Sequence, residues 1–165
     1  MTGVVTDLDV CLERVLTTRL VEPHLGQPGV ALDLGGGTGP YAVWLTELGW
    51  DVRAWPGGLR FDAVVGLEPF RHPTADDVRA LARITRPGGL VALAIPPLPA
   101  FAAPGFDTVT VVAAKTLLAD DLEAVRLVDP SAYRVRLDRL VAGADDPLVL
   151  ATAPHLLWVG RRAYR

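Results

Sequence analysis

Hydrophobic and polar residues follow two alternating patterns along the 165-residue chain. Apolar residues spaced as on one face of a helix predict helices over 6–21, 41–48, 74–85, 116–128 and 131–142. Short apolar runs predict buried strands over 30–34, 51–55, 61–67, 90–95, 108–112 and 155–160. Because strands and helices alternate, the pattern predicts an α/β fold in which a parallel sheet is covered by helices on both faces.

Residues that start and stop helices support these boundaries. Pro40 suits a first helical turn, and Gly49 suits the position just after a helix. Thr74 and Asp77 have the spacing of a capping box, in which side chains and backbone amides bond reciprocally at the start of a helix. The Pro-Gly-Gly sequence at 87–89 predicts the break that separates this helix from the next strand.

Length, composition and charge narrow the class of protein. The chain length fits one domain, residues 1–165, and the 19 acidic and 16 basic side chains leave a net charge of −3, without the basic excess that nucleic-acid binding needs. The single cysteine excludes a disulfide framework and a cysteine-based zinc site, and no metal site is expected. The N-terminus has no signal-peptide pattern, and prolines interrupt the apolar stretch 90–106. These features predict a cytoplasmic protein with no nucleic-acid or membrane partner.

A cluster of glycines follows the first predicted strand. Residues 35–39 read Gly-Gly-Gly-Thr-Gly, and a helix is predicted directly after them. Without Cβ atoms the backbone can turn sharply and bring its N–H groups close to a ligand, and the helix directs its positive end toward the same place. Asp33, just before the loop, is a candidate contact for a cationic or hydroxylated ligand. A ligand-free tight turn, with Asp33 capping the N–H groups of its own loop, remains the alternative.

Three kinds of glycine loop compete for this segment. The phosphate loop of nucleoside triphosphatases needs Gly-Lys-Ser/Thr, and the segment has no lysine. The dinucleotide-binding fingerprint needs a third glycine where Pro40 stands. The spacing that remains is Asp-x-Gly-x-Gly-x-Gly, from Asp33 to Gly39.

With this spacing the chain resembles the class I S-adenosylmethionine-dependent methyltransferases. Residues 31–39 are similar to the first motif of that family, 61–72 to its fourth-strand motif, 86–93 to its fifth strand with the preceding turn, and 158–162 to its closing strand. The resemblance covers about residues 28–113 and the C-terminus. It implies a Rossmann-like methyltransferase sheet.

The resemblance also implies roles for individual residues. S-adenosyl-L-methionine would be the cofactor, with Asp33 near its methionine amino group and the glycine loop around its carboxypropyl and ribose parts. The implied cofactor-binding residues are Asp33, Gly35, Gly36, Gly37, Gly39 and Glu68. Glu68 and His72 would lie beside a small-molecule acceptor as catalytic residues, and imidazole titrates in the range of a general base. A histidine before Pro73 is, however, more often an ordinary loop residue than a catalytic one.

The sequence departs from the family on the adenosine side. In the family the second strand usually ends in a carboxylate that grips the ribose hydroxyls, whereas here Trp55 or Pro56 occupies that place. A lost charged hydrogen bond costs on the order of 1.5–3 kcal/mol, so cofactor binding is expected to be weakened or lost. Trp55 is a candidate to recover part of this by stacking on the adenine. Only residues 56–60 join the second and next strands, so the region of the family's third strand and its preceding helix is predicted to be deleted.

The predicted topology follows from this deletion. In the family's labels the expected strand order is 2-1-4-5-7-6, with the last strand antiparallel. Residues 1–28 would form an N-terminal helical segment, and 115–153 a helical insertion before the last strand. Strand 51–55 would lie at an open sheet edge, which predicts a homo-oligomer or a protein partner that covers it.

Two functions follow from the sequence. One is an S-adenosylmethionine-dependent methyltransferase that acts on a small molecule by proximity and orientation. The other is a non-catalytic methyltransferase-like protein that serves as a structural or regulatory partner. The intact first loop favours the enzyme, and the losses on the adenosine side favour the partner.

Overall fold

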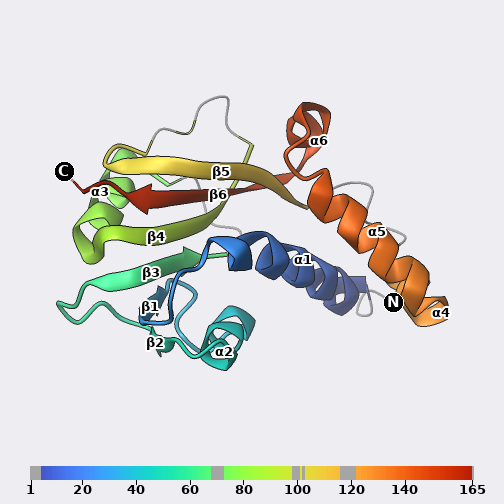
Figure 1. The fold of residues 1–165 in the computed structure, drawn as a ribbon, viewed down its shortest axis with the longest axis horizontal. Coiled ribbons are helices and arrows are strands. Elements are labelled where there is room, and N and C mark those ends of the chain that lie inside the picture. The colour runs from blue at the N-terminus through green and yellow to red at the C-terminus, as the bar shows by residue number, and fades with distance from the viewer. Residues whose placement is uncertain (1–4, 68–72, 98–100, 102, 116–121, 165) are drawn as a thin grey trace.

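A computed structural model describes residues 5–67, 73–97, 101, 103–115 and 122–164. It contains a six-stranded sheet with helices on both faces, which confirms the predicted α/β fold class (Figure 1). The strands are β1 Val30–Asp33, β2 Asp51–Arg53, β3 Phe61–Gly66, β4 Thr85–Ile95, β5 Phe106–Lys115 and β6 His155–Arg162. The helices are α1 Val5–Val21, the 3-10 helix η1 Glu22–His24, α2 Pro40–Glu47, α3 Ala75–Ile84, α4 Leu122–Val128, α5 Pro130–Ala142 and α6 Pro147–Thr152.

The strand order is β2-β1-β3-β4-β6-β5. Strands β2, β1, β3 and β4 pair in parallel, and β6 is antiparallel to both of its neighbours. This is the predicted order, including the antiparallel last strand. Residues 54–60 join β2 to β3 without a helix or a strand, and β2 forms one edge of the sheet.

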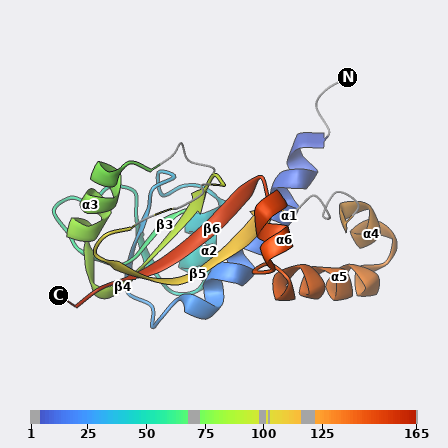
Figure 2. The same ribbon diagram turned by 90° about the horizontal axis from the view of Figure 1, so that it is seen from above.

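Each face of the sheet has its own apolar core. On one face, α1 and α2 contribute buried side chains such as Val21 and Leu45, which pack near Val159 of β6. On the other face, Leu81 of α3 packs with Phe61 and other strand residues. A third cluster joins α1 to α4 and α5 beyond the end of the sheet, where Figure 2 shows α4 and α5 standing beside α1.

The capping box predicted at the start of α3 is present. The Asp77 amide donates to Thr74 Oγ1 at 3.2 Å, and the Thr74 amide donates to Asp77 Oδ2 at 2.8 Å. Helix α3 then buries Val78 and Leu81, while Asp76, Arg79 and Arg83 are exposed. The cap therefore fixes where the helix begins over the carboxyl end of the sheet.

Several boundaries differ from the predictions. The strand predicted over 51–55 ends at Arg53, and the strand predicted over 108–112 extends over Phe106–Lys115. The strand predicted from Leu90 begins at Thr85 and runs through Pro87-Gly88-Gly89, because an irregular register against β3 absorbs this segment and Gly88 adopts a φ of +77°. Within the predicted helical insertion 115–153, the sequence does not predict α6 as a separate helix. Its six residues are too few for a clear helical spacing, although Asp146 caps it by accepting from the Leu148 amide at 2.8 Å. Residues 116–121 of the predicted helix 116–128 lie outside the described residues.

Candidate functional site

The glycine loop leaves the carboxyl end of β1, between β2 on one side and β3 on the other. Ligands of open α/β sheets bind outside the carboxyl ends of the strands, where connections from neighbouring strands diverge. Helix α2 begins at Pro40, and Gly39 at its N-cap supplies no side-chain cap. The positive end of α2 therefore points toward the loop, and Gly39 provides no side chain that could accept from the first amides of the helix.

Asp33 organises the loop from within. Its side chain is 3% exposed, and its Oδ1 and Oδ2 accept from the amides of Gly35 at 2.9 Å and Gly37 at 3.2 Å. The backbone carbonyl of Asp33 accepts from the amide of Gly36 at 3.2 Å. All three amides of the triple glycine are thus directed back at one residue. The side chain of Asp33 thus caps the N–H groups of its own loop, the role that the sequence left as an alternative.

Glycine is favoured at positions 36 and 37 for different structural reasons. Gly37 has a φ of +73°, and a Cβ added there would lie 2.7 Å from Ala54 Cβ, so the loop packs against the residue that follows β2. Gly36 has a φ of +97°, but a Cβ there would meet no heavy atom within 4 Å. The backbone at Gly36 therefore borders open space, which leaves room for a ligand.

No carboxylate stands at the end of β2 that adjoins the glycine loop. Arg53, its last residue, pairs with Asp51 of the same strand at 2.6 Å. Ala54 backs Gly37, and Trp55 is 79% exposed. The indole is accessible to a ligand, and its predicted stacking on adenine stays a prediction.

Glu68 and His72 lie outside the described residues. Of the remaining predicted site residues, the structure brings together Asp33, Gly35, Gly36 and Gly37 in one bonded loop, with Gly39 at the start of the next helix. Trp55 follows the residue on which this loop packs.

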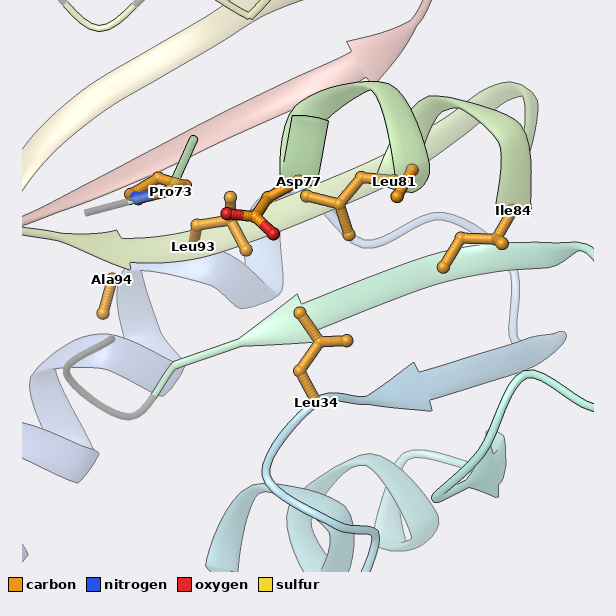
Figure 3. A pocket seen from close by; sticks show the side chains of 8 residues that line it. Leu34, Pro73, Asp77, Leu81, Ile84, Leu93 and Ala94 are labelled. Carbon is orange, nitrogen blue, oxygen red and sulfur yellow. The ribbon is translucent and has the colours of Figure 1, made fainter. Parts of the chain in front are cut away.

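A cavity of about 260 Å³ between α3 and the sheet was not found from the sequence. The labelled side chains in Figure 3 surround it from α3 and from the strands below. Its lining residues are Leu34, Pro73, Asp77, Ala80, Leu81, Ile84, Leu93 and Ala94. Leu34 joins Asp33 to the glycine loop, so the cavity begins where that loop begins. The apolar face of α3 was visible in the sequence, but a gap between that face and the sheet depends on helix placement, which periodicity does not report.

Asp62 is a second carboxylate that accepts a hydrogen bond from a backbone amide, and it lies at the opposite end of the sheet. Its Oδ2 accepts from the Val30 amide at 2.9 Å, and Arg86 Nη1 contacts its carboxyl oxygens at 2.7 Å. Burial favours the neutral form of this carboxyl, but the Val30 amide and the Arg86 guanidinium together favour the carboxylate more and lower its pKa below the ordinary 3.8. Asp62 thus fastens β3 to the start of β1 and to β4, at the end of β1 opposite the glycine loop.

Among the described residues there is neither a metal-binding cluster nor a helix that could span a membrane. These residues contain no group of three or more His, Cys, Asp or Glu side chains arranged to hold a metal ion. In the same part of the chain, each helix is too short or too polar to cross a membrane.

No family model and no curated protein matches the sequence. Among solved structures, the chain is similar to the 1,6-didemethyltoxoflavin-N1-methyltransferase of Burkholderia thailandensis with bound 1,6-didemethyltoxoflavin and S-adenosylhomocysteine. The match has a TM-score of 0.53 at 17% identity, over 96% of this chain and 80% of that one. The N-methyltransferase NodS of Bradyrhizobium japonicum WM9 matches with a TM-score of 0.45 at 13% identity, over 93% and 97% of the two chains. The first of these similarities shows that the chain has the class I methyltransferase fold.

Proposed function

We propose that this protein binds S-adenosylmethionine at loop 35–39 and transfers its methyl group to a small molecule in the cytoplasm. The observation that carries the proposal is the ordered glycine loop at the carboxyl end of β1, with open space at Gly36. The fold supports it, because the similar Burkholderia thailandensis methyltransferase contains S-adenosylhomocysteine.

The residues of this loop have different proposed roles in cofactor binding. Gly36 offers uncovered backbone, and the amides of Thr38 and Gly39 precede the positive end of α2, which suits an anionic carboxylate on the ligand. Asp33 is a positioning residue, because its oxygens are occupied by loop amides and its side chain is almost fully buried. Its negative charge also favours a cationic amino group nearby.

The chemistry requires little from the protein beyond orientation. When bound, S-adenosylmethionine supplies a methyl group on an electrophilic sulfonium. Holding an acceptor in line with that methyl group can provide much of the acceleration. Glu68 and His72 remain the proposed residues beside the acceptor, with His72 as a general base.

The adenosine side is proposed to bind weakly. Because β2 ends in Arg53 and the exposed Trp55 follows shortly after, the ribose hydroxyls lack the acidic partner that the family resemblance implies. Loss of one charged hydrogen bond, on the order of 1.5–3 kcal/mol, corresponds to roughly a ten- to hundredfold weaker affinity. Stacking on Trp55 offsets part of this loss.

Calorimetric titration with S-adenosylhomocysteine tests the proposal. Asp33→Asn is expected to weaken binding at least about tenfold, because an NH₂ group replaces one of the two accepting oxygens and cannot accept from a loop amide. Asp62→Asn is the matched control, since it changes a carboxylate that accepts a backbone amide at the other end of the sheet and should leave the affinity unchanged. Equal affinity in the two variants would contradict the proposed site.

A non-catalytic role is the second candidate. The amides of Gly35, Gly36 and Gly37 favour this candidate, because all three donate to Asp33. These bonds explain the glycine loop as a structural turn that needs no ligand. Under this alternative a folded sample gives no heat with millimolar S-adenosylhomocysteine. Either candidate is proposed to include a homo-oligomer or a protein partner at the open β2 edge.

A further inference from the structure

The cavity under α3 and the glycine loop share one wall. Leu34 lines the cavity, and it lies in the chain between Asp33, the buried anchor of the loop, and Gly35. Leu93 and Ala94 line the same cavity from the last residues of β4. Leu34, Leu93 and Ala94 therefore bring the cavity to the carboxyl end of the sheet, the end at which the loop leaves β1, while Ile84 lines it from the last residue of α3 (Figure 3).

The cavity walls select for an apolar occupant. Leucine, isoleucine, alanine and proline form most of the lining, and Asp77 is the one charged residue among the described lining residues. Asp77 Oδ2 accepts from both the amide and the hydroxyl of Thr74 at 2.8 Å, so this carboxylate serves the helix cap. At about 260 Å³ the cavity exceeds the roughly 150 Å³ apolar cavity that holds a benzene molecule, and it has room for one or two fused rings.

We propose that the α3 cavity binds the apolar ring of a small aromatic or heteroaromatic methyl acceptor. The acceptor role rests on the proposed function, because a methyl donor must lie at the adjoining loop. The ring occupies the cavity between α3 and β4, and its edge near Leu34 faces the loop. The substrate class is thus a compact, largely uncharged ring system.

Indole is a suitable probe of this cavity. In a nuclear magnetic resonance titration of the full chain, indole is expected to shift the amide signals of Leu93, Ala94 and Leu81 in a saturable way. Ala80→Phe places a ring in the lining and should weaken indole binding at least about tenfold. Ala75→Phe makes the same change on the same helix outside the lining, and should leave binding unaltered.

The outcomes separate this proposal from the proposed function. Absence of saturable shifts at these residues in wild-type protein, or equal indole binding by Ala80→Phe, would overturn the ring site. S-adenosylhomocysteine is titrated separately against wild type and Ala80→Phe, and unchanged affinity is expected. Failure of that titration with wild type overturns the methyltransferase proposal, while the indole result still decides whether the cavity is a ligand site.

The open edge formed by β2 carries a second, independent inference. The Asp51 amide donates to the Gly29 carbonyl, and successive residues of a strand direct their N–H and C=O groups to opposite edges. The backbone groups of Val52 therefore point away from β1, to the side on which the described residues place no strand. In an antiparallel pair centred on Val52, Asp51 of one copy lies opposite Arg53 of the other.

We propose that two copies of this chain associate through β2 about a two-fold axis at Val52. Two backbone hydrogen bonds between the Val52 residues and two Asp51–Arg53 pairs form together, because a two-fold contact repeats every interaction. Both side chains are exposed and already lie close to each other on one face of β2, at 2.6 Å. The edge is therefore complementary to itself in charge.

Charge reversal tests this pairing by light scattering and analytical ultracentrifugation. Arg53→Asp and Asp51→Arg should each give monomers alone, since each sets like charges opposite one another. An equimolar mixture of the two should restore a dimer, because the doubly acidic edge of the first variant then faces the doubly basic edge of the second. A monomeric wild type at high concentration, or a mixture that stays monomeric beside a dimeric wild type, would overturn the proposal.

Discussion

On one side of β3 the sheet consists of long strands, with 11 residues in β4, 8 in β6 and 10 in β5. On the other side, β1 and β2 span 4 and 3 residues. The long half buries Trp158 between two phenylalanines, whereas the short half exposes Trp55. The glycine loop and the open edge both belong to the short half. The centre of the core and the candidate cofactor loop thus lie in different parts of one sheet, as is common where loops on a firm scaffold carry function.

The largest expected effect comes from removing the centre of the long half. Trp158 is 1% exposed, stands edge-on to Phe101 and Phe106 at 5.1 and 5.8 Å, and donates from Nε1 to Thr108 at 3.1 Å. Trp158→Ala should lower the free energy of unfolding by about 3–5 kcal/mol in urea titrations. Trp55→Ala, the same change in the short half, should alter it by less than about 0.5 kcal/mol. Similar losses in both variants would contradict the comparison.

Trp55→Ala should weaken cofactor binding although it leaves the stability of the fold nearly unchanged. Loss of a base-stacking contact is worth about 1–3 kcal/mol, so the affinity for S-adenosylhomocysteine should fall roughly 5- to 150-fold. Leu148→Ala changes another exposed apolar side chain, on α6, and is the control. Calorimetry measures the affinity of both variants for S-adenosylhomocysteine. Unchanged affinity in Trp55→Ala would contradict stacking of the adenine on Trp55.

A smaller effect is expected within the glycine loop. Alanine at Gly36 should cost about 1–2 kcal/mol of unfolding free energy, because its φ is positive but the space around it is open. Alanine at Gly37 should cost more, because its Cβ would also collide with Ala54. Urea unfolding of both variants checks the order. An equal cost would show that the loop does not pack on Ala54 as described.

The smallest expected effect concerns acid stability. Because the pKa of Asp62 is lowered in the folded protein, its carboxylate adds stability above the ordinary pKa of 3.8, and this stability is lost as the pH falls through the folded pKa. Arg86 is half-exposed, so the pair contributes at most about 1 kcal/mol. The difference in unfolding free energy between wild type and Asp62→Asn should shrink between pH 6 and pH 3. A difference that is constant over this range would contradict the assignment.

Much of the fold could be predicted from local pattern. Apolar runs located all six strands, and Thr74 with Asp77 marked the start of α3, because these signals depend on neighbours in the sequence. The extension of β4 through Pro87 could not be predicted, since it depends on pairing with β3 across the sheet. The sequence located the glycine loop but did not decide whether Asp33 faces a ligand or its own amides, which depends on the three-dimensional path of the loop. The α3 cavity depends likewise on how a helix sits over the sheet.

The most direct test of the central claim is a ¹H–¹⁵N correlation titration of the wild-type protein with S-adenosylhomocysteine. Saturable binding should shift the amide signals of Gly36, Thr38 and Gly39 most strongly, while those of Val30 and Asp62 at the other end of the sheet stay in place. Shifts that are absent at millimolar ligand, or that fall away from residues 35–39, would contradict the account.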